Sequence, residues 1–244
     1  MTSLVERFEA FIKTVRGFES IDAILKNRDV DGKKRADYLL WDRRIIVEQK
    51  VLVTDPADKP QKFMDKLMKE GRVLVYGTLS TDRIFAGMPD GEEQKRRMLR
   101  TITKGLETSF EAADKQTRDT RDLFEIQDAV GIVVILNLSA PTLRPDVMSY
   151  GLSQVLAKRT IDGGIRYPHN DGVVVFSEAH TDVSRGGRGA PCFSSPTPHT
   201  RSAQSVRAFS DTLVNEWAAF NGLPLWPVNT NEVLRRPKRS TGMP

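Results

Sequence analysis

The amino-acid sequence predicts an α/β fold with a mixed central sheet flanked by helices. Two continuous runs rich in β-branched residues, GIVVILNL (131–138) and DGVVVFSEAH (171–180), are typical of strands that are covered on both faces. Segments with helical spacing of apolar residues precede, separate and follow these runs. Neither internal repeats nor a long linker interrupt the pattern, which favours one domain over residues 1–234 and a basic flexible tail over 235–244.

The N-terminal part of the chain predicts a helix followed by a β-hairpin. Apolar residues recur at helical spacing over residues 3–18, and the sequence SLVE at the start of this segment can form a capping box. Two strand-like runs, 36–41 and 44–53, then meet at the sequence WDRR. Asp42 and Arg43 are the expected loop residues, although Asp-Arg is a weaker two-residue turn signal than Asp-Gly.

The rest of the chain alternates helix and strand signals. The longest helical segment carries a single apolar stripe, and the proline at position 145 suits the first turn of a helix. The expected elements are a short helix over 61–70, a brief strand over 73–77, a long helix over 91–124, a strand over 131–138, a helix over 145–158, a strand over 171–180, a loop over 183–200 and a last helix over 203–220.

Composition excludes several classes of protein. A single cysteine, Cys192, excludes an internal disulfide framework and suits a reducing compartment. The N-terminus lacks the apolar core of a signal peptide, and no apolar run approaches the roughly 18 residues of a membrane span. We therefore expect a cytoplasmic protein without a membrane partner. The net charge of +5 is compatible with a polyanionic partner and also with a mildly basic, solvated surface.

Three charged side chains stand in strand-like runs that otherwise have the composition of buried strands. The expected hairpin places Asp37 opposite Glu48, with Lys50 two residues along the same strand. The face shared by the two strands then contains Asp37, Leu39, Trp41, Ile46, Glu48 and Lys50. Opposed carboxylates destabilise a sheet, whereas a divalent cation between them removes the repulsion. A lysine beside such a site can stabilise charge on a phosphate, so these residues have the chemistry for metal-assisted phosphodiester hydrolysis.

Asp37, ten intervening residues and then Glu48-Gln49-Lys50 on an apolar strand resemble the motif of the PD-(D/E)xK nuclease superfamily. The resemblance implies the restriction-endonuclease-like fold, whose core runs helix, three-stranded meander, helix, strand. It implies that Asp37 and Glu48 bind Mg²⁺ or Mn²⁺ and that Lys50 assists the attacking water. The backbone carbonyl of Gln49 would be a further metal ligand. DNA is then favoured over RNA as the partner, and a homodimer would suit an enzyme that cuts both strands.

The surroundings of this motif, rather than its tripeptide, make it specific. The same tripeptide recurs as Glu93-Gln94-Lys95 in the polar start of the long helix, where a solvated surface is expected. The first copy differs because IIV precedes it, VLV follows it, and Asp37 lies upstream at hairpin distance. Arg35-Ala36 stands where the superfamily's name-giving Pro precedes the Asp, and the close resemblance covers only residues 30–53.

Two helical residues are candidate additions to the site. Many members of the superfamily place a glutamate on the first helix, and some branches place Gln or Lys on the helix after the E-x-K strand. Glu9 borders the apolar face of the first helix whereas Glu6 points nearly opposite, which makes Glu9 the candidate there. Gln116 flanks the apolar stripe of the long helix and is the second candidate. A solvent-facing side chain is the alternative for both.

Basic residues near the motif are candidates for contacts with phosphate groups. They are Lys33, Lys34 and Arg35 before the first strand of the hairpin, and Arg185 and Arg188 in the loop SRGGRG. Flexible, solvated side chains are the equally weighted alternative.

Other motifs give weaker hypotheses. Glu178, His180 and Asp182 alternate along a strand end and could bind a metal, but polar residues there more often face water. Cys192 with His199 suggests a cysteine hydrolase, for which no orienting Asn or Asp is identifiable. Neither G-x-x-x-x-G-K-[ST] nor G-x-G-x-x-G occurs, so ATP or dinucleotide chemistry has no support.

The leading hypothesis is a Mg²⁺-dependent deoxyribonuclease, a hydrolase acting on phosphodiester bonds. A catalytically inactive nuclease-like module that binds nucleic acid or a protein partner remains an alternative. An α/β interaction protein, in which the three charges lie on an ordinary edge hairpin, is a further one.

Overall fold

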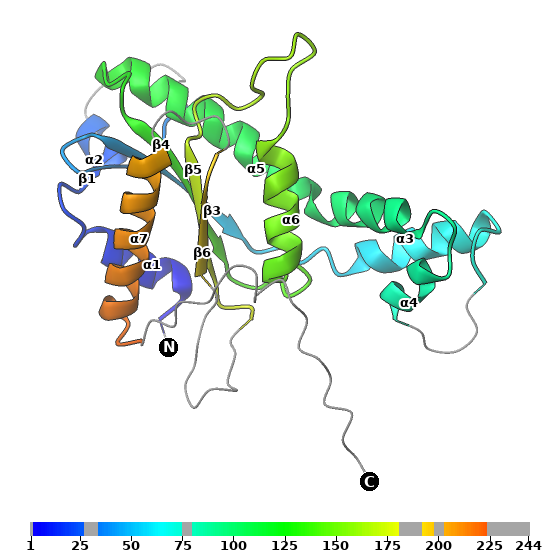
Figure 1. Cartoon of the computed structure of the whole chain (residues 1–244). Helices are drawn as coiled ribbons and strands as arrows, with labels where there is room; N and C mark the ends of the chain where they lie inside the picture. Colours follow the sequence, from blue (N-terminus) through cyan, green and yellow to red (C-terminus); the bar gives the residue numbers. More distant parts are fainter. Residues whose placement is uncertain (1, 27–33, 75–79, 181–191, 198–202, 224–244) are drawn as a thin grey trace.

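The computed structural model describes residues 2–26, 34–74, 80–180, 192–197 and 203–223. It is a mixed α/β structure with an open six-stranded sheet and helices on both sheet faces (Figure 1). The predicted α/β class is therefore confirmed.

The sheet contains a short antiparallel meander joined to a parallel centre. The strands are β1 (Glu19–Ser20), β2 (Tyr38–Leu40), β3 (Ile45–Leu52), β4 (Val130–Asn137), β5 (Gly172–Ser177) and β6 (Cys192–Pro196), in that spatial order. Strands β3, β4 and β5 are parallel, and the other neighbouring pairs are antiparallel. Every residue of β4 and β5 is buried, as their uninterrupted apolar runs predict.

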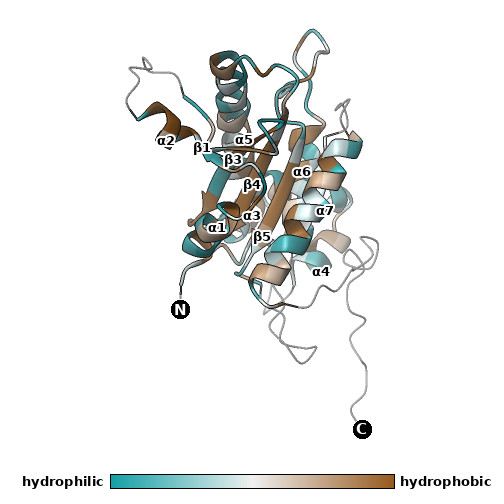
Figure 2. Cartoon of the chain, turned by 90° about the vertical axis from the view of Figure 1, so that its left-hand side faces the viewer, coloured by the Kyte–Doolittle hydropathy of each residue, from teal (hydrophilic) through white to brown (hydrophobic). Residues whose placement is uncertain are grey.

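The helices are α1 (Leu4–Ile12), α2 (Ile21–Leu25), α3 (Asp58–Lys69), α4 (Thr81–Ala86), α5 (Gly91–Phe124), α6 (Pro145–Leu156) and α7 (Ala203–Phe220). The bounds of α5 and α7 are the predicted ones. Figure 2 shows hydrophobic strands between helices that carry hydrophilic residues on their outer sides, the distribution expected of amphipathic helices on a buried sheet.

Side chains of alternate strand residues enter two separate cores. On one face, α1 and α7 contribute Phe8, Phe11 and Trp217 to a core that includes Val47 and Ile132 of the sheet. On the other face, the core contains Leu106 and Phe110 of α5, Met148 and Leu152 of α6, and Val133 and Ile135 of β4. Glu48 and Lys50 are in register with Val133 and Ile135, so their side chains lie on the face covered by α5.

The hairpin between β2 and β3 has the predicted register, with Leu39 opposite Ile46. Asp42 and Arg43 both have positive φ angles, 56° and 64°, as a type I′ turn requires. Trp41 also has a positive φ, 51°, and its ring packs edge-on against Phe209 at 5.2 Å on the α1/α7 side. The expectation that Trp41 shares the face of Leu39 is therefore wrong, because the left-handed turn begins one residue earlier than two-residue alternation assumes.

Salt bridges and a close backbone approach support this turn. Arg43 donates two hydrogen bonds to Glu19, at 2.8 and 2.7 Å, and Arg16 donates one to Asp42. Gly17 has a φ of +67°, and a Cβ atom there would lie 2.6 Å from the backbone nitrogen of Asp42. The ion pairs and the close approach of Gly17 thus hold the charged residues Asp42 and Arg43 in the left-handed conformation of the turn.

The first helix is shorter than predicted. Helix α1 ends at Ile12 rather than at residue 18, and Thr14 Oγ1 donates to the carbonyl oxygen of Phe11 in the following turn. Strand β1 and helix α2 then occupy a region where no element was predicted. They form because β1 pairs with β2, a contact between distant segments that local periodicity does not contain.

Four other local expectations are changed. Helix α4 was not predicted, and α3 begins three residues before the expected position 61. Val73 and Leu74 lie in no strand, and the remainder of the expected strand 73–77 is outside the described residues. The loop expected over 183–200 contains strand β6, which pairs with β5 although its sequence CFSSP has little strand signal. The tail at 235–244 is also outside the described residues.

Helices α3 and α4 and the first turns of α5 form an arm that extends away from the sheet (Figure 1). Met64, Leu67, Phe85 and Met98 give this arm a buried apolar contact that continues into the core under α5 and α6. No helix in the described part of the chain is both long and apolar enough to cross a lipid bilayer.

Two helical glycines provide a matched test of the packing between α5 and α6. A Cβ on Gly151 of α6 would lie 2.6 Å from Cβ and Cγ2 of Thr103, whereas a Cβ on Gly105 of α5 would meet no atom within 4 Å. We expect Gly151→Ala to lower the free energy of unfolding by ~1–3 kcal/mol, since overpacking exceeds the gain in helix propensity. Gly105→Ala should raise it by ~0.5–1 kcal/mol.

Urea unfolding of both variants measures the difference. Equal effects of the two substitutions would show that α6 does not approach α5 through Gly151.

Candidate active site

The start of β2 brings Asp37 to the neighbouring strand at the level of Glu48. The N–H of Asp37 donates to the carbonyl oxygen of Val47 at 3.1 Å, which continues the hairpin register by one residue. The N–H of Gln49 donates to Asp37 Oδ2 at 2.7 Å. Asp37 is thus fixed by its backbone and its side chain beside residues 47–49 of β3.

Glu48 is almost completely buried, with 2% of its surface exposed. Its Oε1 atom accepts a hydrogen bond from Lys50 Nζ at 2.5 Å, and the lysine side chain is 20% exposed. Its Oε2 atom is buried and has no hydrogen-bond donor within the described part of the chain. A buried acceptor without a donor costs ~1–3 kcal/mol, so this oxygen marks an arrangement that packing alone does not explain.

Helix α5 holds the other side of Lys50. Lys50 Nζ donates to Gln116 Oε1 at 2.8 Å, and Gln116 Nε2 donates to the carbonyl oxygen of Arg35 at 2.8 Å. One turn later, Thr120 Oγ1 accepts from the N–H of Ala36 at 2.9 Å. The helix therefore orients the amide of Gln116 and anchors the segment that leads into Asp37.

Burial raises the pKa of both carboxyl groups. Burial, with a further contribution from the Asp37 charge, raises the pKa of Glu48 from 4.5 to about 8, against the opposing effect of Lys50. Burial also raises the pKa of Asp37, although the hydrogen bond from the Gln49 N–H opposes the change. A cation beside them would lower the free-energy cost of ionising both carboxyl groups.

Within the described residues, the backbone of β3 has an edge next to these carboxylates that no strand covers. The hydrogen bonds Val130 N–H to Arg44 O (2.8 Å) and Leu138 N–H to Leu52 O (3.2 Å) show that even-numbered residues of β3 face β4. Odd-numbered residues face the other side, where β2 pairs only with residues 45–47. Since the N–H and C=O of a strand residue point to the same side, the Gln49 carbonyl points to the edge where its N–H meets Asp37.

These groups fit a small divalent cation. Mg²⁺ and Mn²⁺ prefer oxygen ligands, and Mg²⁺ is commonly held by one or two carboxylates while it keeps several waters. Asp37, Glu48 and the Gln49 carbonyl would hold the ion. The residues described contain no group of three or more His, Cys, Asp or Glu side chains suited to a metal. Among the described residues, Asp37 and Glu48 are thus the carboxylates that this site offers to a cation.

Glu9 is exposed on α1, the helix that covers the opposite sheet face from Glu48. Burial, with a smaller contribution from the charge of Glu9 among others, raises the pKa of Tyr38 to about 12. The hydroxyl of Tyr38 donates to Gln49 Oε1 at 3.4 Å. The structure thus places Glu9 near Tyr38 and does not bring it into one carboxylate group with Asp37 and Glu48.

The predicted phosphate contacts are described only in part. Lys34 is exposed, and Arg35 forms an ion pair with Asp22 at 3.0 Å. The backbone carbonyl of Arg35, rather than its side chain, contacts the site through Gln116. Lys33, Arg185 and Arg188 lie outside the described residues.

The competing motifs do not form comparable sites among the described residues. Glu178 forms an ion pair with Arg7, which already supplies a cation to that carboxylate, and Asp182 is outside the described residues. Cys192 lies in β6, whereas His199 falls outside the described part of the chain.

The second E-x-K copy lies on a helix surface. Glu93 pairs with Arg97 at 3.1 Å and Lys95 pairs with Asp82 at 3.1 Å. Gln94 is buried and donates to Asp90 at 2.7 Å. The expected solvated surface thus applies to the two charged residues and not to Gln94.

Sequence reasoning missed three contacts of the site, those of Tyr38, Thr120 and the Arg35 carbonyl. Thr120 lies four residues after Gln116 and therefore on the same side of α5, which was a usable signal. Backbone carbonyl contacts have no side-chain signature and could not be identified in this way.

The raised pKa of Glu48 predicts a stability difference that depends on pH. Between pH 4.5 and 8 the folded protein retains a proton on Glu48 that the unfolded chain has lost, so the contribution of Glu48 to the free energy of unfolding falls as pH rises through this range. Gln cannot titrate. In metal-free buffer, Glu48→Gln should therefore gain stability relative to the wild type by on the order of 3 kcal/mol from pH 5 to pH 8.

Urea unfolding with EDTA at several pH values tests this, with Glu93→Gln as a control that should follow the wild type. Parallel curves for the wild type and Glu48→Gln would mean that the Glu48 carboxyl titrates normally.

Comparison of the chain with protein-family profiles, with curated proteins and with solved structures found no match. These comparisons do not bear on the resemblance to the PD-(D/E)xK superfamily. The functional proposal therefore rests on the geometry of the site.

Proposed function

We propose that the protein is a metal-dependent nuclease of restriction-endonuclease-like fold that hydrolyses phosphodiester bonds in DNA. The observation that supports this best is the environment of Glu48. A buried carboxylate is joined to Lys50, its second oxygen has no donor among the described residues, and it lies beside Asp37 at an open sheet edge.

The order of elements supports the proposed fold. Helix α1, the antiparallel meander β1–β2–β3, helix α5 and strand β4 occur in the order of the superfamily core, with the short helix α2 inserted between β1 and β2. Helices α3 and α4 are additions between the meander and α5. In this arrangement the two carboxylates and the lysine come from the meander, and Gln116 comes from the helix that covers it.

The hydrogen bonds of Lys50 suit it to act on water or phosphate. Its ammonium group has three N–H donors, of which one is directed to Glu48 and one to Gln116. The third donor is available to the attacking water or to an oxygen of the scissile phosphate. Gln116 and Glu48 hold the ammonium group from two sides, which limits its freedom before substrate arrives.

A bound Mg²⁺ or Mn²⁺ would polarise the phosphate and lower the pKa of a coordinated water. Asp37 and Glu48 would bind this ion as ionised carboxylates, and Lys50 would position the water for in-line attack. The open edge of β3 gives a phosphate access to these groups from the side that β2 leaves uncovered.

Cleavage assays with the two E-Q-K copies test the proposal. Lys50→Ala should lower the rate of DNA cleavage in Mg²⁺ or Mn²⁺ by about 10²–10⁴-fold, since it removes the group that acts on the water or on the developing charge. Lys95→Ala removes the same charge from the other copy and should leave cleavage unchanged. Plasmid DNA, linear duplexes, single strands and RNA are the substrates, with EDTA as the metal-free reaction.

Binding measured at the same salt concentration separates catalysis from attraction. Lys50→Ala should retain most DNA affinity, because phosphate contacts are spread over several basic residues. Equal losses of binding and cleavage would mean that Lys50 only attracts DNA as part of the basic surface and has no catalytic role. DNA binding by the wild type without cleavage in either metal would contradict the nuclease and favour the non-cutting module.

A further inference from the structure

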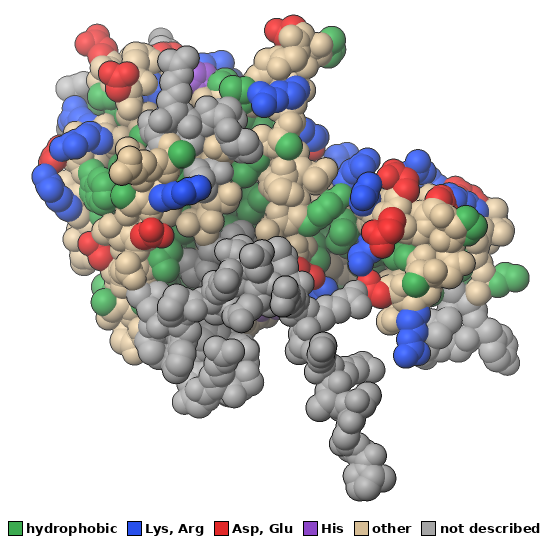
Figure 3. All heavy atoms as spheres, viewed as in Figure 1, with side chains coloured by type: hydrophobic (Ala, Val, Ile, Leu, Met, Phe, Trp, Pro, Cys, Tyr) green, Lys and Arg blue, Asp and Glu red, His purple; other side chains and the backbone are tan. Residues whose placement is uncertain are grey.

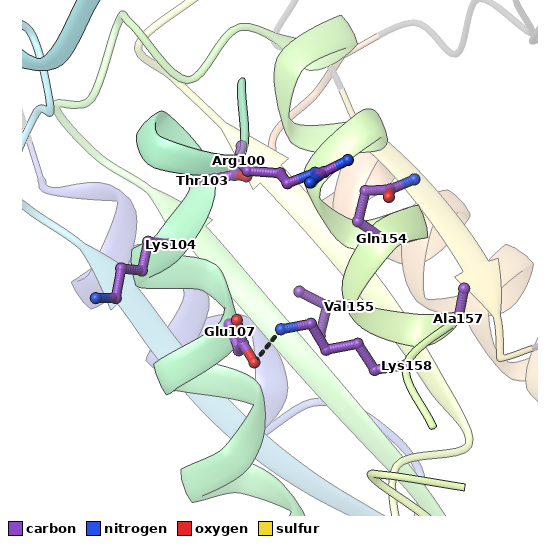
Figure 4. Close-up of a pocket in the computed structure, with 9 residues that line it drawn as sticks. Arg100, Thr103, Lys104, Glu107, Gln154, Val155, Ala157 and Lys158 are labelled. Carbon is purple, nitrogen blue, oxygen red and sulfur yellow. Dashed lines mark hydrogen bonds and ion pairs between the residues drawn. The ribbon is translucent and has the colours of Figure 1, made fainter. Parts of the chain in front are cut away.

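A second polar site lies between α5 and α6, away from Glu48. Here a cavity of about 440 Å³ is lined by side chains of both helices (Figure 4). Gly151 allows the two helices to approach closely, because its missing Cβ would lie 2.6 Å from Thr103. Figure 4 shows Arg100 reaching from α5 toward Gln154 on α6, whereas the Lys104 side chain leaves the same helix on the side away from α6. The lining thus contains three cations, Arg100, Lys104 and Lys158, and the amide of Gln154.

The charge of this cavity is not balanced within the described structure. Glu107 is its one acidic lining residue, and it already accepts from Lys158 and from the hydroxyl of Tyr167. Arg100 and Lys104 are exposed, lie four residues apart on α5, and form no ion pair with any described residue. Like charges at this spacing repel by ~0.2–0.5 kcal/mol, so the pair is destabilising unless an anion binds.

Several neighbouring cations on the arm are paired with acidic residues. Their ion pairs are Lys62–Asp58, Lys66–Glu70, Arg72–Asp90, Lys95–Asp82 and Arg97–Glu93. Figure 3 shows Lys and Arg side chains beside Asp and Glu side chains along this arm. Arg96, Arg100 and Lys104 follow one another at four-residue spacing on α5, and none of them forms an ion pair with a described residue.

We propose that this cavity binds a backbone phosphate of the DNA substrate. The proposal rests on the nuclease function proposed above, which supplies DNA as the polyanion. Arg100 would bind the phosphate through its guanidinium fork, and Lys104 would add a second charge. Gln154 would donate a neutral hydrogen bond from α6.

Helix α5 connects this phosphate site to the proposed catalytic site. Arg100 precedes Gln116 by 16 residues, which corresponds to about 24 Å along the helix axis. At ~3.4 Å per base pair this is the length of about seven base pairs. The two sites lie on different flanks of α5, so a duplex that contacts both would cross the outer side of the helix. The cavity contact would fix the position of the duplex and carry no sequence information.

The test is DNA binding by Arg100→Gln/Lys104→Gln in the full chain. A fluorescent duplex of about 30 base pairs is titrated in EDTA, so that cleavage does not interfere, over 50–200 mM salt. Two lost phosphate contacts should reduce the slope of log affinity against log salt by about 2. The affinity ratio of wild type to variant should therefore shrink about 10-fold across this range.

Lys13→Gln/Arg207→Gln is the matched control. Both residues are exposed on α1 or α7, at the opposite face of the sheet, and the substitutions remove the same charge. The control should keep the wild-type slope. Equal slope changes in the two double variants would overturn the proposal, because net charge rather than the cavity would then control binding.

A second arm separates DNA phosphate from small phosphate compounds. Thermal melts with pyrophosphate are recorded for the wild type and for Arg100→Gln/Lys104→Gln. Stabilisation of the wild type alone, combined with unchanged DNA binding by the variant, would overturn the proposal in favour of a small-molecule site. Absence of DNA binding by the wild type would also overturn it. Failure of the nuclease function alone would appear differently, as DNA binding with the expected slope change but without cleavage.

Discussion

The arrangement of the site depends on the burial of the Glu48 carboxylate in a strand at the centre of the sheet. A charge there is unfavourable unless neighbouring groups compensate it, and the chain supplies Lys50 for one oxygen only. Gln116 holds the lysine from the other side, and the Arg35 carbonyl holds Gln116. The burial of the Glu48 carboxylate thus accounts for the polar groups around it: a lysine from the hairpin, a glutamine from the long helix and a backbone carbonyl from the segment before Asp37.

Two structural devices place these groups. The left-handed turn at residues 41–43 sets the hairpin register that brings Asp37 to the level of Glu48, and pairing with β4 fixes the face on which Glu48 and Lys50 lie. Strand β2 is short, so the edge of β3 beyond Val47 is not covered by another strand in the described structure. The same truncation leaves the Gln49 carbonyl without a partner strand among the described residues, which the proposed approach of a phosphate requires. One hairpin thus has two effects: its register brings the two carboxylates together, and its short strand β2 leaves the edge of β3 beside them without a partner strand in the described structure.

The sequence was sufficient for the parts of the fold that rest on local periodicity. Helices α5 and α7 have their predicted bounds, and the spacing from Asp37 to Glu48 gave the correct register because a two-residue loop leaves little choice. Gln116 could be proposed from its place beside an apolar stripe. Strands β1 and β6 were missed because pairing with a distant strand forms them. Glu9 was proposed from one helical wheel, which cannot show that its helix covers the other sheet face.

The most direct measurement of the account is the position of a bound divalent ion. Crystals of the full chain soaked in Mn²⁺ at pH 8 would locate the metal through its anomalous scattering. We predict one manganese site whose ligands are the carboxylates of Asp37 and Glu48 and the carbonyl oxygen of Gln49, at about 2.0–2.3 Å. Lys50 should then remain close enough to contact a water on the ion. Manganese bound elsewhere, with Glu48 still paired only to Lys50, would contradict the assignment of these carboxylates as metal ligands.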